Sequence, residues 1–245
     1  MEKKLKSWQG WLLFGGTMVV VFVLGMIAAS VNERHAEVTS VMNNKKTEIT
    51  GIEARNDKFE SNYPREYQTW EATADTSFKS LYNGNQAVDV LEARPEMVIL
   101  WAGYAFSKDY STPRGHMHAI EDMRNTLRVG APMTENEGPQ PATCWTCKSP
   151  DVPRMMQAMG VDNFYKGKWA SLGKEIVNPI GCADCHEPEN MNLHISRPAL
   201  IEAFQRQGKD ITKATQQEMR SLVCAQCHVE YYFKGDGEIL DFPLG

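Results

Sequence analysis

The sequence predicts a mainly α-helical protein with few short strands, preceded by an apolar N-terminal segment. Strand-like alternation of apolar and polar residues is scarce, whereas the longer patterns are those of helices or loops, over 86–106, 113–129, 152–173 and 196–222. From Trp11 to Ser30 the chain carries no charged residue, and the middle of this run reads MVVVFVLGM. The 245 residues are enough for one sizeable domain or two small ones.

Residues 1–32 are expected to form a signal anchor or a signal peptide. As a helix, the uncharged run would reach about 30 Å, the thickness of the hydrocarbon core of a bilayer. Basic residues precede it at Lys3, Lys4 and Lys6, and AAS at 28–30 offers a small-residue cleavage site. A buried core helix is the alternative, but the segment is terminal and apolar on every face. The basic start predicts export of the rest to the periplasmic side of the cytoplasmic membrane.

Residues 33–60 are polar and lack a clear apolar period, which indicates a spacer that is helical in part. Aromatic and turn residues become frequent from NYPREYQTW onward, so the globular part is expected at 61–245. The formal charge of the chain is −5, and no basic surface indicates a nucleic-acid partner.

All six cysteines occur in Cys-x-x-Cys pairs, within CWTCK (144–148), CADCH (182–186) and CAQCH (224–228). Disulfide scaffolds rarely place every cysteine at one spacing. A four-cysteine zinc site would exceed the usual spacing and leave both histidines unexplained. Cys-x-x-Cys-His attaches c-type haem, because the two thiols bind the porphyrin edge and the histidine reaches the iron. The sequence therefore favours haem c over zinc or disulfides, with attachment at Cys182, Cys185, Cys224 and Cys227 and iron ligation by His186 and His228.

CWTCK has two interpretations. In one, Cys144 and Cys147 are an unrelated dithiol, and Lys148 is an ordinary surface lysine. In the other, they hold a third haem whose iron is ligated by the Lys148 amine, which must first lose its proton from a free pKa of about 10.4. An amine has no second ring nitrogen through which to receive the electron push of a hydrogen-bonded imidazole. A haem ligated differently from its neighbours is a candidate for substrate binding at an open iron.

The segment 113–129 is predicted to be a helix with Thr112 as N-cap, Pro113 at the first position and Gly130 beyond the end. Positions i, i+4, i+7 and i+11 then form one apolar face, made of His116, Ile120, Met123 and Leu127.

Far-side ligands for the histidine-bound haems must come from the remaining histidines. A histidine on an apolar face is usually a satisfied core residue, but this chain needs buried axial ligands, and His116 is the better candidate. His118 is expected on the opposite, solvent-exposed side, and His194 at the surface.

Several segments together resemble the pentahaem ammonia-forming cytochrome c nitrite reductases, from about Tyr63 to the last residue. They are MVILWAGYAFSKDY, PRGH, TLRVGAP, CWTCKSPDVPRMM, GKWA, GCADCH, SRP and CAQCHVEYYF. Cys-x-x-Cys-Lys followed by two Cys-x-x-Cys-His motifs is itself a rare order. The resemblance implies a compact multihaem cytochrome c domain. It also implies six-electron reduction of nitrite to ammonium at the lysine-ligated haem.

The resemblance further implies roles for individual residues. Lys148 would ligate the active-site haem, and His116 would cap the haem attached at Cys224 and Cys227. Arg128 and Tyr231 would be catalytic, and the Glu230 carboxylate would bind calcium with the Tyr231 main-chain carbonyl. Taken alone, these residues have ordinary alternatives. An arginine at a helix C-terminus is usually a solvated charge, the tyrosine would pack, and the glutamate would be a surface acid.

Members of the resembled family are longer, so 61–245 is expected to be the N-terminal part of the catalytic domain, with three of the family's five haem motifs. The implied partners are nitrite, a membrane quinol-oxidising cytochrome c and, for the full-length protein, a second subunit in a homodimer. Two alternatives remain. One is another lysine-ligated multihaem reductase of nitrogen or sulfur oxyanions, and the other is a non-enzymatic trihaem electron carrier.

Overall fold

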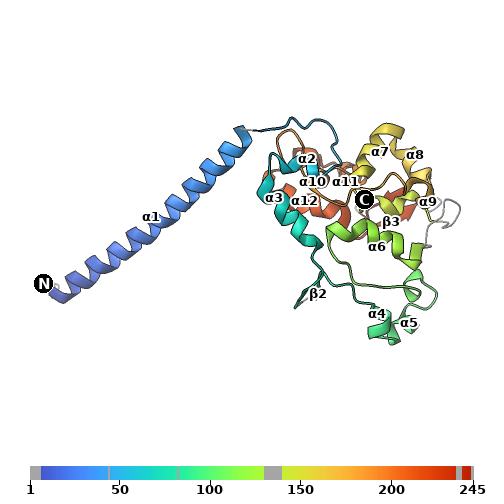
Figure 1. Cartoon of the computed structure of the whole chain (residues 1–245), viewed down its shortest axis with the longest axis horizontal. Coiled ribbons are helices and arrows are strands. Elements are labelled where there is room, and N and C mark those ends of the chain that lie inside the picture. Colours follow the sequence, from blue (N-terminus) through green and yellow to red (C-terminus); the bar gives the residue numbers. More distant parts are fainter. Residues whose placement is uncertain (1–6, 44, 82, 130–139, 236–238, 244–245) are drawn as a thin grey trace. The chain divides into compact units, whose positions relative to one another are not determined.

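The structure is a computed structural model that describes residues 7–43, 45–81, 83–129, 140–235 and 239–243. The chain divides into two compact units, Met1–Lys46 and Thr47–Gly245, which are treated separately. Helices dominate the described residues and the strands are short, so the predicted fold class is confirmed (Figure 1).

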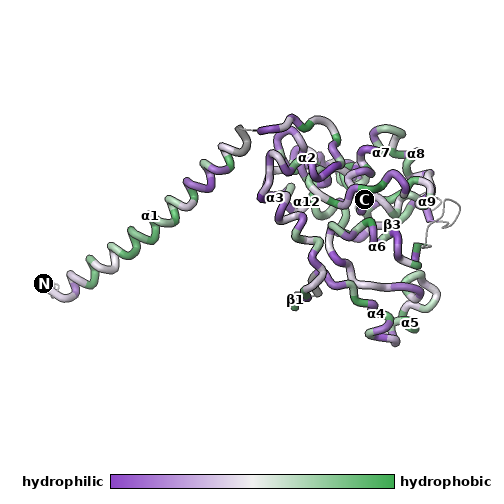
Figure 2. Tube along the Cα trace, in the orientation of Figure 1, coloured by the Kyte–Doolittle hydropathy of each residue, from purple (hydrophilic) through white to green (hydrophobic). Residues whose placement is uncertain are grey.

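The first unit consists of α1, Ser7–Asn43, which continues past the uncharged run into the segment expected to be a spacer. Figure 2 shows apolar residues along most of α1 and polar residues near its C-terminal end. Among the described residues, α1 is the one helix long and apolar enough to cross a membrane. Its large apolar side chains, such as Trp11 and Phe22, are exposed. Both findings are compatible with the predicted anchor or signal peptide.

The second unit is built from short helices joined by turns. Its α-helices are α2 (Asp57–Glu60), α3 (Pro64–Glu71), α4 (Val90–Ala93), α5 (Glu96–Leu100), α6 (Ala119–Asn125), α7 (Asp151–Met159), α8 (Val161–Lys166), α9 (Trp169–Leu172), α10 (Cys182–Cys185), α11 (Pro198–Arg206) and α12 (Gln216–His228). Its 3-10 helices are Ala72–Ala74, Ala105–Ser107, His116–His118, Leu127–Val129, Ala142–Trp145 and Ile211–Lys213. In Figure 1, α4 and α5 lie at the edge of this unit, away from α7 to α12.

Two antiparallel pairs of strands complete the second unit. β1 (Lys79–Ser80) pairs with β2 (Asn83–Gly84). β3 (Tyr232–Lys234) pairs with β4 (Ile239–Asp241), in a register that sets Tyr232 opposite Asp241. The second pair follows α12 directly and therefore positions the residues just beyond the third cysteine motif.

Residues 47–60, which the sequence assigned to the spacer, are packed within the second unit. Phe59 is fully buried, and Asn56 and Asn62 are 5% and 6% exposed. The Asn62 side chain accepts from Thr47 N and donates to Thr47 O, at 3.0 and 2.7 Å. Asparagine side chains thus satisfy main-chain groups here, so a polar composition is compatible with an ordered segment.

The helix expected over 113–129 is interrupted, which corrects the prediction at both of its ends. Thr112 does not cap it, because its hydroxyl accepts from Val88 N at 2.9 Å. Gly115 has φ +100°, and regular α-helix begins only at Ala119. At the other end, Thr126 is extended, and Leu127 is 55% exposed instead of facing the core.

One apolar core lies beneath α7 to α9, α11 and α12. Trp145 and Trp169 are completely buried and stack with their ring centroids 5.4 Å apart and their planes at 7°. Ile120 of α6 is also in this core and Met123 packs against it, so one member of the predicted apolar face is buried and another is partly buried. The core therefore lies directly against the first and third cysteine motifs.

Candidate functional site

The first motif, CWTCK, is positioned by the tryptophan pair. Trp145 lies between the two cysteines, and its indole nitrogen donates to Trp169 O at 2.9 Å. Asp151, just beyond the motif, is 1% exposed and accepts from Val177 N and Asn178 N at 2.8 and 2.9 Å. These contacts leave Lys148 half-buried at the end of a fixed turn. They also explain the packing role of the tryptophan in GKWA.

The second motif, CADCH, is held by residues far upstream. Asn56 accepts from Cys182 N and donates to Pro179 O, both at 3.0 Å. The Trp70 indole donates to Ile180 O at 2.8 Å. Gly181 is required here, because a Cβ atom at this position would overlap the side-chain amide of Asn56.

His186 of the second motif has one ring nitrogen already engaged. Its Nδ1 lies 2.8 Å from Met191 O. Among the described non-glycine residues, Met191 alone has a positive φ, of 61°. A histidine that donates from Nδ1 to a main-chain carbonyl presents Nε2 as its free acceptor, which is the usual arrangement of a metal-ligating histidine.

The third motif, CAQCH, forms the last turn of α12. A capping box begins this helix, with Thr215 and Glu218 bonding to each other's main-chain nitrogens. His228 at its end faces His116, and the two ring centroids are 6.2 Å apart. Metal–imidazole bonds of about 2 Å place two such centroids about 6 Å apart when the rings flank one metal. The predicted pair is thus brought together at a separation that suits one iron.

His116 is exposed to solvent, which corrects its predicted place on a buried apolar face, and the charged groups nearest to its ring are His228, Asp184 and Lys148. The pKa of its imidazole lies below the ordinary value, because partial burial disfavours the cation and because His228 adds like charge. Lowering this pKa favours the neutral ring, which is the form that binds a metal.

His118 and His194 differ from expectation. The His118 side chain is only 13% exposed, so the prediction of a wet residue is wrong. Its Nε2 lies 3.1 Å from Ala74 O, and its Nδ1 lies 3.4 Å from Glu121. His194 is partly buried instead of exposed, and its Nδ1 is buried without a partner. Since both nitrogens of His118 have protein partners, His116 is the better placed of the two for metal binding.

The first and third motifs meet through their cysteines. A hydrogen bond from Cys227 holds the pKa of Cys147 at about 7, against the opposing effect of burial, and Arg197 acts in the same direction. The same contact raises the pKa of Cys227. All six thiols are free, so none of the motifs is closed by a disulfide.

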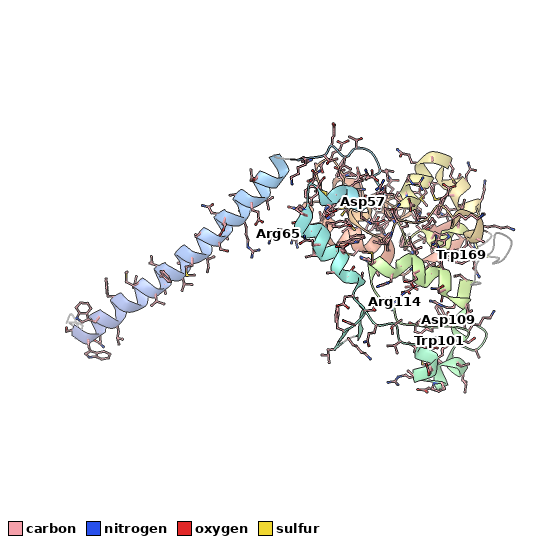
Figure 3. The ribbon with its side chains drawn as sticks, viewed as in Figure 1. Asp57, Arg65, Trp101, Asp109, Arg114 and Trp169 are labelled. Carbon is pink, nitrogen blue, oxygen red and sulfur yellow. The ribbon has the colours of Figure 1, made fainter. Side chains whose placement is uncertain are left out.

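Lys148 and Arg128 line one cavity of about 310 Å³. Asp109 and Arg114, labelled in Figure 3, line it as well. The Arg128 guanidinium lies over the rings of Phe106 and Tyr110, at 5.0 and 5.7 Å from their centroids. Its Nε is buried without a hydrogen-bond partner. Arg128 is therefore not a freely solvated charge at a helix end, because two aromatic rings hold its guanidinium beside the cavity.

Asp109 fixes the turn that carries Arg128. Its Oδ2 accepts from Thr126 Oγ1 and from Leu127 N, at 2.9 and 2.7 Å. The bond from Leu127 N satisfies the first main-chain donor of the 3-10 helix Leu127–Val129. The sequence analysis missed Asp109, because its partners are distant in sequence and no local pattern marks it.

Tyr231 lies near the same groups, immediately before β3. It is 49% exposed, and its ring packs against Phe233 with centroids 5.7 Å apart. The pKa of its hydroxyl is raised, first by partial burial and then by the nearby Cys147 and Cys144 thiols, while Arg128 opposes the rise. The structure thus brings the neighbourhoods of Tyr231, Arg128 and the first motif together.

Comparison with known proteins identifies the family. The profile of the cytochrome c552 family matches residues 55–244. The chain belongs to the cytochrome c552 family. The family predicted from the sequence is therefore confirmed, and this match begins upstream of the 61 expected for the globular part.

Individual relatives agree with this membership. Cytochrome c-552 of Parabacteroides distasonis is 99% identical over 243 residues, which are 99% of this chain and 49% of the relative. Cytochrome c-552 of Bacteroides fragilis is 76% identical over the same shares. The chain thus spans about half the length of the curated relatives it matches.

A solved relative supports the fold. The cytochrome c nitrite reductase catalytic subunit of Desulfovibrio desulfuricans, a structure with two calcium sites, superposes with a TM-score of 0.72 and 32% identity. The superposition covers 80% of this chain and 45% of that subunit.

The residues of the cytochrome c552 chain fit haem c but do not by themselves fit calcium. Free thiol pairs, an oriented His186 and the facing His116 and His228 suit covalent porphyrin with axial ligands. Glu230 is exposed, and no cluster of three histidine, cysteine or acidic side chains suited to a metal occurs among the described residues. Calcium takes about six to eight oxygen ligands, more than Glu230 and the Tyr231 carbonyl supply.

Proposed function

We propose that the three motifs of this chain each hold one haem c, and that the protein reduces nitrite to ammonium at the haem ligated by Lys148. In this assignment Cys144 and Cys147, Cys182 and Cys185, and Cys224 and Cys227 form the thioether bonds. His186 and His228 are near-side ligands, and His116 is the far-side ligand of the haem at the third motif.

The observation that carries the proposal is that Lys148 and Arg128 line the same cavity. An amine and an oriented guanidinium that line the same cavity suit an iron ligand and an anion-binding group. The solved nitrite reductase, 32% identical to this chain, supports nitrite as the anion.

Haem c held by Cys144, Cys147 and Lys148 would supply a redox-active iron for the reduction of nitrite. Arg128 binds an oxygen of nitrite and stabilises the negative charge that develops as each N–O bond breaks. Phe106 and Tyr110 hold its guanidinium in place, so that little reorganisation is needed. The Tyr231 hydroxyl donates hydrogen bonds and protons to the leaving oxygens. The overall reaction consumes one nitrite, six electrons and eight protons, and it yields one ammonium and two waters.

The proposal also includes where the protein lies in the cell and what it binds there. The apolar α1 anchors or exports the chain, and the second unit lies on the periplasmic side of the cytoplasmic membrane. A membrane quinol-oxidising cytochrome c supplies the electrons, and the full-length protein forms a homodimer. Glu230 and the Tyr231 carbonyl contribute two oxygens to calcium binding, with further ligands from other groups.

Replacement of Arg128 tests the proposed activity. In the haem-loaded protein, Arg128→Ala should lower kcat for nitrite-dependent ammonium formation about 100- to 1000-fold, as loss of one oxyanion donor does. The haem absorption spectrum should not change. Arg124→Ala is the matched control, because Arg124 donates to Gly173 O and Ile176 O and does not line the cavity. Equal ammonium formation by the two variants would contradict the assignment.

The two other functions predict different outcomes of the same assay. A reductase of another nitrogen or sulfur oxyanion would turn over that anion faster than nitrite, and would lose this activity in Arg128→Ala. A trihaem electron carrier would accept and donate electrons without any spectral change on addition of nitrite. Nitrite binding that shifts the absorption of the Lys148 haem supports the proposed reductase.

A further inference from the structure

Arg197, in the segment SRP, is the one lysine or arginine that is buried among the described residues, and it has no part in the mechanism above. Its side chain is 1% exposed. Arginine is almost never fully buried unless its charge and donors are matched. The partners of Arg197 therefore show what the buried charge is for.

Arg197 bonds to the main chain on both sides of Lys148. Its Nε donates to Thr146 O at 2.9 Å, and its Nη2 donates to Ser149 O at 2.7 Å. The planar fork of one guanidinium thus fixes two carbonyls that bracket the lysine.

The same guanidinium contacts the second motif. Its Nη1 forms an ion pair with Asp184 Oδ1 at 2.5 Å and donates to Ser196 Oγ at 2.6 Å. Asp184 is the third residue of CADCH and is 3% exposed. Its other carboxylate oxygen accepts from Gly181 N at 2.8 Å, so the carboxylate spans the start of α10.

Gln226, the third residue of CAQCH, completes the connection. It is 1% exposed, and its Oε1 accepts from Ser196 N and Arg197 N, at 3.0 and 3.1 Å. Its Nε2 donates to Asp184 O at 2.9 Å. The third residue of every motif, Thr146, Asp184 and Gln226, is therefore bonded within one buried network that includes Arg197.

Stability alone does not explain this network. A buried ion pair pays a large desolvation penalty, and apolar residues of similar volume often stabilise a fold as well or better. Geometry is what the network adds, because the hydrogen bonds of the Arg197 guanidinium to Thr146 O, Ser149 O and Ser196 Oγ each have a fixed direction. The network spans segments far apart in sequence that carry the three attachment sites.

We propose that Arg197 is a positioning residue that holds the three haem-attachment motifs at fixed separations and sets the Lys148 backbone at the substrate-binding haem. The inference rests on the proposed attachment of haem at all three motifs. Through this network, the relative placement of the haems and the local electrostatic field at each iron depend on one guanidinium.

The test replaces Arg197 by lysine in the haem-loaded chain. Arg197→Lys keeps the positive charge but has a single nitrogen, which cannot reach both carbonyls, Ser196 and Asp184 at once. Three readouts are needed: haem-peptide mapping after proteolysis, the electron paramagnetic resonance spectrum and the midpoint potential of each haem. Arg124→Lys is the matched control, since Arg124 also donates to two main-chain carbonyls but lies outside the motifs.

In Arg197→Lys, the spectrum and the midpoint potential should change both for the Lys148 haem and for at least one histidine-ligated haem. Neither should change in Arg124→Lys. Joint loss of haem from all three motifs, with full loading of Arg124→Lys, supports the proposal equally. Unchanged spectra and potentials, or a change confined to one haem, overturn it, whatever the melting temperature does.

A second variant keeps the test decisive where Arg197→Lys affects folding. Gln226→Leu removes the bonds to the third motif and leaves the Arg197 contacts with the first two. It should alter the haem at Cys224 and Cys227 while the Lys148 haem keeps its wild-type spectrum. The reverse pattern overturns the proposal. A wild-type chain with fewer than three haems contradicts the proposed function instead, before either variant is compared.

Discussion

Around the cysteine motifs, Trp145, Trp169 and Arg197 are each no more than 1% exposed, whereas Tyr231 is 49% exposed and Leu127, next to Arg128, is 55% exposed. We call the first region, made of the three motifs and the side chains packed on them, the attachment region. The second, residues 106–128 and 229–233, is the distal region. The attachment region is fixed by dense packing and buried hydrogen bonds, while the distal region is fixed by a few contacts on short elements.

This difference indicates two ways of positioning functional groups. A covalently attached cofactor requires anchors that do not move, and a buried network provides them. Groups that meet a small substrate need orientation but also access, which an aromatic-supported arginine on a turn provides. Substitutions in the attachment region should therefore affect folding and loading, and those in the distal region should affect rate.

The largest effect is expected from Gly181→Ala in the attachment region. The added methyl overlaps the buried Asn56 amide, which should lower the free energy of unfolding by about 3 kcal/mol, as overpacking does. Haem loading at Cys182 and Cys185 should fall with it, measured by haem-peptide mapping. Asn56→Ala in the same chain should relieve the overlap, so a double variant less stable than Asn56→Ala alone by the full amount would contradict this explanation.

Asp241 should sharpen the comparison, because it joins the hairpin of β3 and β4, which begins in the distal region, to the end of α11. Burial alone would raise its pKa, but bonds to Lys234 and Arg206 outweigh burial and hold it at about 2. Since the unfolded value is about 3.9, the carboxylate should contribute about 2 kcal/mol to stability above about pH 4, lost as the pH falls toward 2.

Denaturant unfolding between pH 2 and 6 measures this contribution. Asp241→Asn should be less stable at neutral pH and should show a flatter profile at the acid end. Asp57→Asn is the control, because the Arg55–Asp57 pair is about half exposed and should contribute little. If the free energy of unfolding fell as steeply toward low pH in Asp241→Asn as in the parent, the loss of stability could not be assigned to Asp241.

The two histidines of the 3-10 helix His116–His118 should behave differently. In the haem-loaded protein, His116→Ala should convert one low-spin haem to high spin, because it removes an axial ligand at the His228 iron. His118→Ala should leave the spin state unchanged and cost about 1 kcal/mol of stability through its lost bond to Ala74 O. The opposite spectral result would show that the facing rings at 6.2 Å do not share an iron.

Among the substitutions expected to change the rate, Asp109→Ala in the distal region should have a smaller effect than Arg128→Ala. Loss of its two bonds should loosen the turn that carries Arg128 and lower kcat/KM for nitrite about tenfold, equivalent to about 1.4 kcal/mol. The melting temperature and haem spectra should stay close to wild type. Asp75→Ala removes a similar cap at Ser77 N, away from the cavity, and should leave the rate unchanged.

The sequence predicted the mainly helical class, the family and the three motifs, because these depend on local patterns. It did not predict the break at Thr126, where a carboxylate from Asp109 replaces the next helical bond. The burial of His118 was missed for a related reason, since its partner Ala74 is distant in sequence. Pattern and spacing describe one segment at a time, and these features depend on contacts between segments.

Arg197 illustrates the same limit inside the candidate site. The segment SRP contributed to the family resemblance, but nothing in the sequence explained its arginine. The carboxylate partner of Arg197 is Asp184, which occupies one of the two unspecified positions of another motif. An acidic residue within Cys-x-x-Cys-His is the one local signal that marks a buried cation nearby. Lys148 and Arg128, by contrast, were singled out from their motifs, and the cavity they share is a property of the folded chain.

The stacked tryptophans give the chain an optical reporter of its own maturation. Trp145 follows Cys144 directly, so a porphyrin bonded to that thiol would absorb the light that this indole emits. Both rings are fully buried, so their emission should lie at shorter wavelength than that of an exposed indole. This short-wavelength component of the fluorescence should disappear as haem is attached at CWTCK.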